Sequence, residues 1–213
     1  MSDARQTRLL TRERPSCRLG EPWPIFGSMP ASARLFAFFA ALAVLPATAA
    51  EIRSAPDRMG GIVLTISGPI VPGDGKRVQD ILGREYRPDR PVTVVLDSPG
   101  GDLDAGMWIA RTIATAQARS AVPAGRMCAS VCFLAWAAGT DRTAEPGAKV
   151  GIHTAAASKI ETDEARAYTL DMARAANLYR VPLDIIGRMV VTKNREMHWL
   201  DEREIRSMTG PRP

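Results

Sequence analysis

The sequence predicts an α/β fold in which β-strands alternate with α-helices. Short apolar runs rich in β-branched residues alternate with stretches whose apolar residues recur at helical spacing. The two plainest runs, residues 61–68 and 92–96, are each followed by a turn containing Gly and Pro and then by a helical pattern. Such alternation is typical of βαβ units and a parallel sheet.

The expected elements follow one another through short connections. Residues 51–60 are polar and are expected to be extended or loose. Strands are expected at residues 61–68, 92–96 and 120–124, briefly within 143–146, and at 149–152. Helices are expected at residues 75–85, 103–118, 162–179 and 183–191, and a further buried helix is expected to open at Ser130.

The turn after the second strand has the composition of an anion-binding site. The strand at 92–96 stops at Asp97-Ser98-Pro99-Gly100-Gly101, and Asp102 and Asp104 then stand in the first turn of a helix. Glycines at a strand-to-helix turn leave backbone N–H groups uncovered, so a negatively charged oxygen can approach them. This is how an oxyanion hole is built.

Further along the chain, Ser130 stands alone in a nearly chargeless run, Met127-Cys128-Ala129-Ser130-Val131-Cys132-Phe133-Leu134. A serine at the start of a buried helix can act as a nucleophile, because the helix N-terminus stabilises developing negative charge. The next apolar run, Lys149-Val150-Gly151-Ile152, ends at His153. A glycine pair, a serine and a histidine therefore follow in order, each at the end of a short buried element.

These three motifs together resemble the ClpP/crotonase superfamily, and within it the ClpP-like serine peptidases. The matching segments are Ser98-Pro99-Gly100-Gly101, Ala129-Ser130 and Pro146-Gly147-Ala148-Lys149-Val150-Gly151-Ile152-His153. The resemblance covers residues 61–210. It implies a stacked spiral of βαβ units with a C-terminal helical segment that serves assembly.

The resemblance also implies roles for the motif residues. Ser130 would be the nucleophile and His153 the base that takes the hydroxyl proton and returns it to the leaving amine. Gly100 or Gly101, together with the N–H of Val131, would hold the oxyanion.

The third member of a triad has no matching residue. The family's acid lies shortly before an aromatic-Leu-(Ser/Thr)-x-x-Glu segment, which here resembles Trp199-Leu200-Asp201-Glu202-Arg203-Glu204. Counting back places Met197 at the expected position, with Glu196 beside it and Asn194 close by. Glu196 is therefore the candidate acid, and Asn194 is the alternative.

The net charge of +5 does not indicate a nucleic-acid partner. Residues 1–49 hold six arginines and three acidic residues, which leaves 22 basic and 20 acidic residues in 50–213. A nucleic-acid binder needs a basic patch on its folded part, and none is evident. No cofactor is predicted.

The N-terminal segment has the form of a secretory signal peptide. Arg34 precedes an apolar core at 35–45, and Ala47-Thr48-Ala49 is a small-residue cleavage site. The apolar core is shorter than the roughly 20 residues that a spanning helix needs. We expect a leader at 1–49, with the signal peptide at 29–49, and a periplasmic or secreted ClpP-like domain at 50–213 without a membrane span. For residues 1–28, either Met29 is the true start or they form a disordered tail.

Export bears on Cys128 and Cys132, which flank Ser130, because disulfides persist in oxidising compartments. Four-residue spacing on a regular helix puts the Cα atoms near the limit of a bridge, which becomes easier if Cys128 precedes the helix. The alternatives are two thiols packed as small apolar side chains and a metal site with His153, which lacks enough ligands. Cys132 also stands where the family usually carries glycine, so its bulk is expected to crowd the substrate pocket.

Three functions are compatible with these features. The first is an exported serine hydrolase, a peptidase that uses Ser130 and His153 on peptides or an exported protein and that assembles as a homo-oligomer. The second, favoured by the imperfect acid position, is a catalytically silent ClpP-like module for binding or assembly. The third is an acyl-CoA enzyme of the crotonase branch, which shares the double-glycine oxyanion hole; export argues against it, since acyl-CoA is an intracellular substrate.

Overall fold

The computed structural model describes residues 49–87, 89–155 and 162–211. The predicted leader, apart from Ala49, lies outside the described residues. So do residues 156–161, which precede the helix expected at 162–179. Within the described ranges, no helix combines the length and apolar character needed to cross a membrane.

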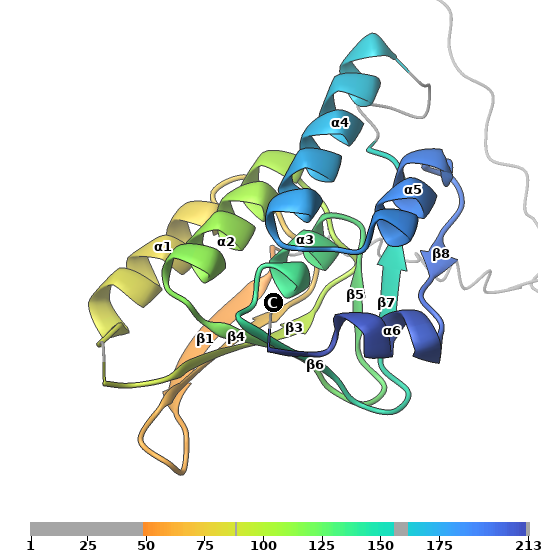
Figure 1. The fold of residues 1–213 in the computed structure, drawn as a ribbon. Coiled ribbons are helices and arrows are strands. Elements are labelled where there is room, and N and C mark those ends of the chain that lie inside the picture. The colour runs from red at the N-terminus through yellow and green to blue at the C-terminus, as the bar shows by residue number, and fades with distance from the viewer. Residues whose placement is uncertain (1–48, 88, 156–161, 212–213) are drawn as a thin grey trace, which may run out of the picture. The chain divides into compact units, whose positions relative to one another are not determined.

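The larger of two sheets contains the predicted βαβ units (Figure 1). Its spatial order is β1-β2-β3-β4-β6-β9. The strands are β1 (Glu51–Pro56), β2 (Ile62–Ser67), β3 (Val92–Asp97), β4 (Arg119–Val122), β6 (Asp141–Ala144) and β9 (Gly210–Pro211). The four central strands are parallel, and β1 and β9 pair antiparallel at the two edges. The parallel sheet is therefore confirmed, and the segment expected to be extended or loose forms edge strand β1.

A smaller sheet carries the candidate site. It consists of β5 (Met127–Ala129), β7 (Lys149–Ile152) and β8 (His198–Trp199), in the order β5-β7-β8. Strands β5 and β7 are parallel, with Cys128 paired to Val150, and β8 runs antiparallel to β7. The ends of β5 and β7 therefore lie side by side, which brings the residues that follow them, Ser130 and His153, into one neighbourhood.

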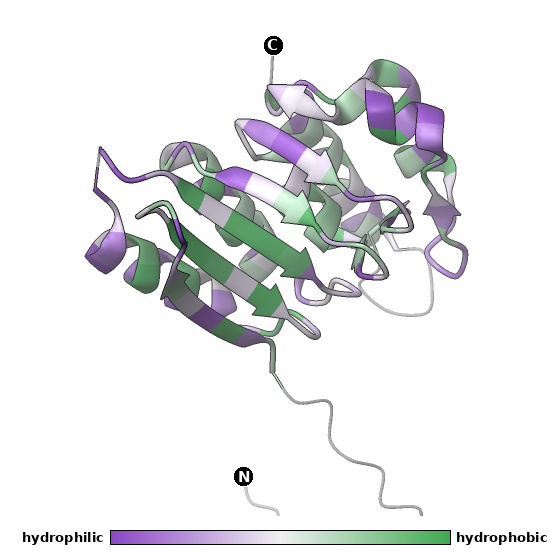
Figure 2. Cartoon of the chain, turned by 90° about the horizontal axis from the view of Figure 1, so that it is seen from below, coloured by the Kyte–Doolittle hydropathy of each residue, from purple (hydrophilic) through white to green (hydrophobic). Residues whose placement is uncertain are grey.

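Helices cover one face of the larger sheet (Figure 1), while its other face, turned to the viewer in Figure 2, carries no helix of the described ranges. The covering helices are α1 (Asp74–Glu85), α2 (Leu103–Thr115) and α3 (Val131–Ala137). Along β2 and β3, buried and half-buried residues alternate strictly. This alternation is what a strand with one face on the core requires.

Helix α3 lies at the centre of the core, and all seven of its residues are buried. It contacts α2, β4, β5 and β7, and also α4 (Asp163–Leu178). At Gly106 of α2, an added Cβ would lie 2.3 Å from a methyl carbon of Val131, so the absence of a side chain there lets the two helices approach. The chain continues through α5 (Leu183–Val191) and α6 (Glu202–Met208).

Candidate active site

Ser130 occupies a tight elbow between the end of β5 and the start of α3. Its backbone has φ 58° and ψ −132°, a region that residues with a side chain rarely adopt. The Ser130 N–H donates to the Gly151 carbonyl at 2.9 Å, and the Ser130 carbonyl accepts from the Phe133 N–H at 2.9 Å. A backbone of this kind costs on the order of 1–3 kcal/mol and persists only where the surrounding structure imposes it.

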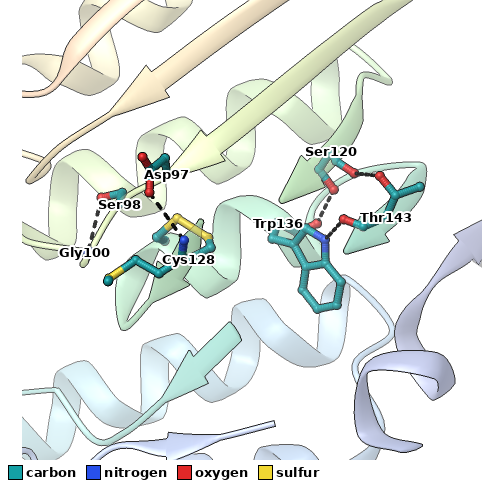
Figure 3. Close-up of a disulfide and its surroundings, with 9 residues drawn as sticks. Asp97, Ser98, Gly100, Ser120, Cys128, Trp136 and Thr143 are labelled. Carbon is teal, nitrogen blue, oxygen red and sulfur yellow. Dashed lines mark hydrogen bonds between the residues drawn. A yellow bond between two sulfur atoms is a disulfide. The ribbon is translucent and has the colours of Figure 1, made fainter. Parts of the chain in front are cut away.

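Hydrogen bonds attach this elbow to the turn at residues 97–101 (Figure 3). The Ser98 N–H donates to the Met127 carbonyl at 2.7 Å, and the Ser98 carbonyl accepts from the Ala129 N–H at 3.0 Å. Asp97 accepts from the Met127 N–H at 3.3 Å and forms a 3.0 Å ion pair with Arg126. Two motifs that are far apart in the sequence are thereby fixed against each other.

Gly100 makes room for the elbow. An added Cβ at Gly100 would lie 2.7 Å from both the Ala129 carbonyl oxygen and the Ser130 Cβ, and its φ of +94° suits glycine. The Gly100 N–H donates to the Ser98 hydroxyl at 3.1 Å inside the turn itself. Its amide is thus engaged, and its contribution here is the close approach of the two backbones.

Gly101 and Val131 carry the backbone donors that remain available. Both residues line the same cavity. Val131 is the first residue of α3, where a helix leaves its N–H groups unsatisfied. In the described part of the chain, neither N–H has a hydrogen-bond partner. Gly101 could not carry a side chain, since an added Cβ would lie 2.0 Å from the Ile70 carbonyl oxygen.

A cavity of about 400 Å³ unites the predicted residues. Ser130 and His153 both line it, together with Gly101 and Val131. The candidate nucleophile, the candidate base and two residues with available amide N–H groups thus line one partly open cavity, which is the arrangement that acyl transfer requires. Between the two side chains themselves, both in the described part, there is no hydrogen bond; such bonds are often long before substrate binds.

His153 follows β7 and is half-buried. Its Nδ1 lies 2.6 Å from the Thr154 carbonyl oxygen. A carbonyl only accepts, so this bond requires a proton on Nδ1, and the neutral ring then carries its lone pair on Nε2. A general base needs that free lone pair. The backbone therefore selects a tautomer that could take a proton.

The two candidates for a third member lie in the turn before β8. Glu196 is exposed, and within the described ranges its carboxylate has no hydrogen-bond or ion-pair partner and does not line the cavity. Asn194, in the same turn, is half-buried. Pairing of Ile152 with His198, continued by one residue, sets Met197 opposite His153. The sulfur of Met197, a weak hydrogen-bond acceptor, lies 2.7 Å from the position that a Cβ on Gly151 would take.

The remaining wall of the cavity combines apolar and acidic groups that the sequence did not single out as site residues. Met172 and Tyr168 come from α4, the helix that the sequence predicted at residues 162–179. Asp104 lines the cavity too. The carboxylates of Glu164 and then Asp104 raise the pKa of the Tyr168 phenol, because an anionic ring is disfavoured beside negative charge. This side of the cavity is therefore electronegative.

A disulfide joins Cys128 and Cys132, which the sequence left open (Figure 3). The Cα atoms are 5.2 Å apart, within the usual range for a bridge. The geometry is feasible because Cys128 belongs to strand β5 and only Cys132 belongs to the helix. Cys132 is fully buried and is not among the residues that line the cavity, so the expected crowding of the pocket is not observed.

Comparison with known proteins identifies the fold. A family model described as Clp protease matches residues 78–177, a range that holds Gly100, Ser130 and His153. The structure is similar to ClpP1 from Listeria monocytogenes, with a TM-score of 0.56 and 20% identity, covering 69% of this chain and 86% of that chain. The chain thus has a ClpP-like fold. A mutant of the same ClpP1 matches at 21% identity with the same TM-score and coverage. No curated protein matches in sequence.

The ClpP-like assignment confirms the predicted family resemblance and the α/β fold class. The glycine turn, the serine elbow and the strand before His153 all lie within the range that the family model matches. The roles of individual site residues stay predictions.

Proposed function

We propose that this ClpP-like protein is a serine hydrolase, and specifically a peptidase, with Ser130 as nucleophile and His153 as base. The observation that carries the proposal is the shared cavity, which Ser130, His153 and the amide-bearing residues Gly101 and Val131 line together. The strained elbow at Ser130 supports it, because strained backbones cluster at active sites.

The proposed reaction begins when Nε2 of His153 takes the Ser130 hydroxyl proton as Oγ attacks the peptide carbonyl carbon. The carbonyl oxygen becomes an oxyanion, held by the N–H groups of Gly101 and Val131; one such donor is worth roughly 3–4 kcal/mol in the transition state. His153 then gives its proton to the leaving amine. Water attacks the resulting acyl-serine by the same route, which releases the acid and regenerates Ser130.

The Thr154 carbonyl supports this role of His153 by accepting the Nδ1 proton. It does for the ring's orientation and tautomer what a carboxylate does in a full triad. A neutral carbonyl stabilises the imidazolium less than a carboxylate would, so the rate would be modest. Glu196, and Asn194 as its alternative, stay predictions for a third side chain.

The protein's setting follows from the same features. We propose a periplasmic or secreted location, supported by the signal-like segment at 29–49 and by the Cys128–Cys132 disulfide, since disulfides persist in oxidising compartments. Peptides or an exported protein would be the substrate. Members of the ClpP family are usually oligomers, and a homo-oligomer is proposed here on that basis.

A fluorophosphonate probe tests the proposal directly, because it phosphonylates an activated serine: the serine oxygen bonds to phosphorus and fluoride leaves. The mature chain should take up one probe, located at Ser130 by peptide mass spectrometry. Ser130→Ala should abolish labelling, whereas Ser207→Ala in α6 should leave it intact. Heat-denatured protein should not react.

The contrary result has a definite meaning. A folded, oligomeric protein in which no probe modifies Ser130 would refute the hydrolase and select the catalytically silent module. One observation favours that second function: within the described ranges, no carboxylate forms a hydrogen bond or ion pair with the His153 ring.

A further inference from the structure

The disulfide forms a small covalent ring around the candidate nucleophile. Cys128 lies two residues before Ser130 and Cys132 two residues after it, so the bridge encloses the whole elbow. Cys128 is held in β5 by pairing with Val150. Cys132 belongs to the fully buried helix α3. The ring thus joins the strand and the helix on either side of the strained residue.

The strain at Ser130 requires a restraint of this kind. With φ of 58° and ψ of −132°, the residue would relax toward an ordinary backbone conformation if its flanks could separate. One backbone bond, from the Ser130 N–H to Gly151, holds it from the side of β7. The disulfide fixes both flanks at once, with the Cα atoms 5.2 Å apart.

We propose that the Cys128–Cys132 disulfide is a positioning element that holds Ser130 in its reactive elbow conformation. The proposal rests on the proposed function insofar as Ser130 is the nucleophile. The cysteines of the disulfide neither line the cavity nor reach solvent, so the bridge acts through the backbone of Ser130 and not on substrate.

Opening the bridge changes no other atom of the chain. A dithiol such as dithiothreitol attacks one sulfur to give a mixed disulfide, and its second thiol then displaces the protein thiol. The products are two cysteine thiols and the cyclic disulfide of the reagent, with two electrons passed to the protein. Since both cysteines are buried, the protein is reduced in denaturant and refolded with the dithiol present.

The first measurement compares the rate at which the fluorophosphonate labels Ser130 in oxidised and in reduced wild-type protein, at a temperature where circular dichroism shows both folded. We expect the reduced protein to react roughly 10- to 100-fold more slowly, as small misplacements of a reacting group do. Reoxidation should restore the rate. Val78→Ala, which removes buried volume from α1, is the control: it should lower the melting temperature and leave the rate unchanged.

A second measurement reports on the elbow without any chemistry at Ser130. Glycine accepts positive φ readily and alanine does not. Ser130→Gly should therefore melt higher than Ser130→Ala in the oxidised protein, where the elbow is enforced. In the reduced protein the elbow can relax, so this difference in melting temperature should shrink.

The outcomes separate the two proposals. Absence of probe reaction in the oxidised protein refutes the hydrolase, yet a redox-dependent difference between Ser130→Gly and Ser130→Ala would still support the positioning role. The positioning role is overturned if the two redox states show equal labelling rates and equal differences in melting temperature between Ser130→Gly and Ser130→Ala. A reduced chain that does not fold assigns the bridge to stability alone and also overturns it.

Discussion

The two histidines of the chain occupy very different surroundings. His198 in β8 lies 3.2 Å from both carboxylate oxygens of Glu204, which is largely buried and also contacts Arg188 Nε at 3.0 Å. Glu204 further accepts the Asp201 N–H in the capping box of α6. His153, by contrast, has one hydrogen bond in the described part of the chain, to the carbonyl of the next residue.

The contrast shows that a histidine–carboxylate pair is not by itself a sign of catalysis. The better-supported histidine is tied to a helix cap and does not line the cavity that holds Ser130. The sparsely bonded one lines that cavity and has its Nε2 left for a proton. What distinguishes them is the presence of a nucleophile and amide donors, which is a property of the site and not of the residue.

The largest expected effect breaks the comparison directly. His153→Ala should lower the rate of fluorophosphonate labelling at Ser130 by about 10²- to 10⁴-fold, because general-base assistance of that size is lost. His198→Ala should leave the rate unchanged, since His198 does not reach the cavity. Pseudo-first-order labelling rates, taken with both variants folded, measure the two. Equal losses in both variants would remove the distinction between the histidines.

Gly100→Ala should have the next largest effect, confined to the Ser130 side. The added methyl group would meet the Ala129 carbonyl and Ser130 Cβ at 2.7 Å, which displaces the elbow. We expect the rate of probe labelling at Ser130 to fall roughly 10- to 100-fold. Gly125→Ala is a matched control, since Gly125 also has positive φ (69°) but no atom within 4 Å of an added Cβ. It should cost stability and not rate; equal rates for both alanine variants would contradict the steric argument.

Glu204→Gln sharpens the other side of the comparison. The amide keeps the shape of the side chain but loses the charge that accepts from Arg188 and His198. We expect the free energy of unfolding, from urea titration, to fall by about 1–3 kcal/mol, which is typical of a lost charged hydrogen-bond partner. The rate of probe labelling at Ser130 should not change. A slower rate at unchanged stability would place this cluster in the catalytic machinery instead.

The fold was predictable because its signals are local. Apolar runs bounded by glycine and proline located β2 and β3, and the helical spacing of α5 located it between Leu183 and Val191. Strand β1 was missed because its sequence shows no apolar alternation. It is an edge strand, and none of its residues is buried. Helix α6 did carry a signal, the capping box from Asp201 to Glu204, which was considered only as part of the family motif.

The site was predictable where a side chain does the work and not where the backbone does. Ser130 and His153 were predicted as site residues from residue type and spacing, and the structure places both at one cavity, while their roles stay predictions. Which glycine amide is engaged depends on the Ser98 hydroxyl bond, a tertiary detail. The carbonyl of Thr154 leaves no mark in a sequence at all, because every residue has one.

The smallest expected effect concerns the missing acid. If Glu196 completed the triad, Glu196→Gln would reduce the rate of probe labelling at Ser130 by about 10⁴-fold, the cost of the corresponding acid-to-amide change in a related constellation. Because Glu196 is exposed and the Thr154 carbonyl already accepts the Nδ1 proton, we expect no measurable change in rate. Asn194→Ala, measured in parallel, tests the alternative residue of the same turn. A large loss in either variant would show that the turn before β8 moves onto His153 when substrate binds, and would give His153 a side-chain support comparable to that of His198.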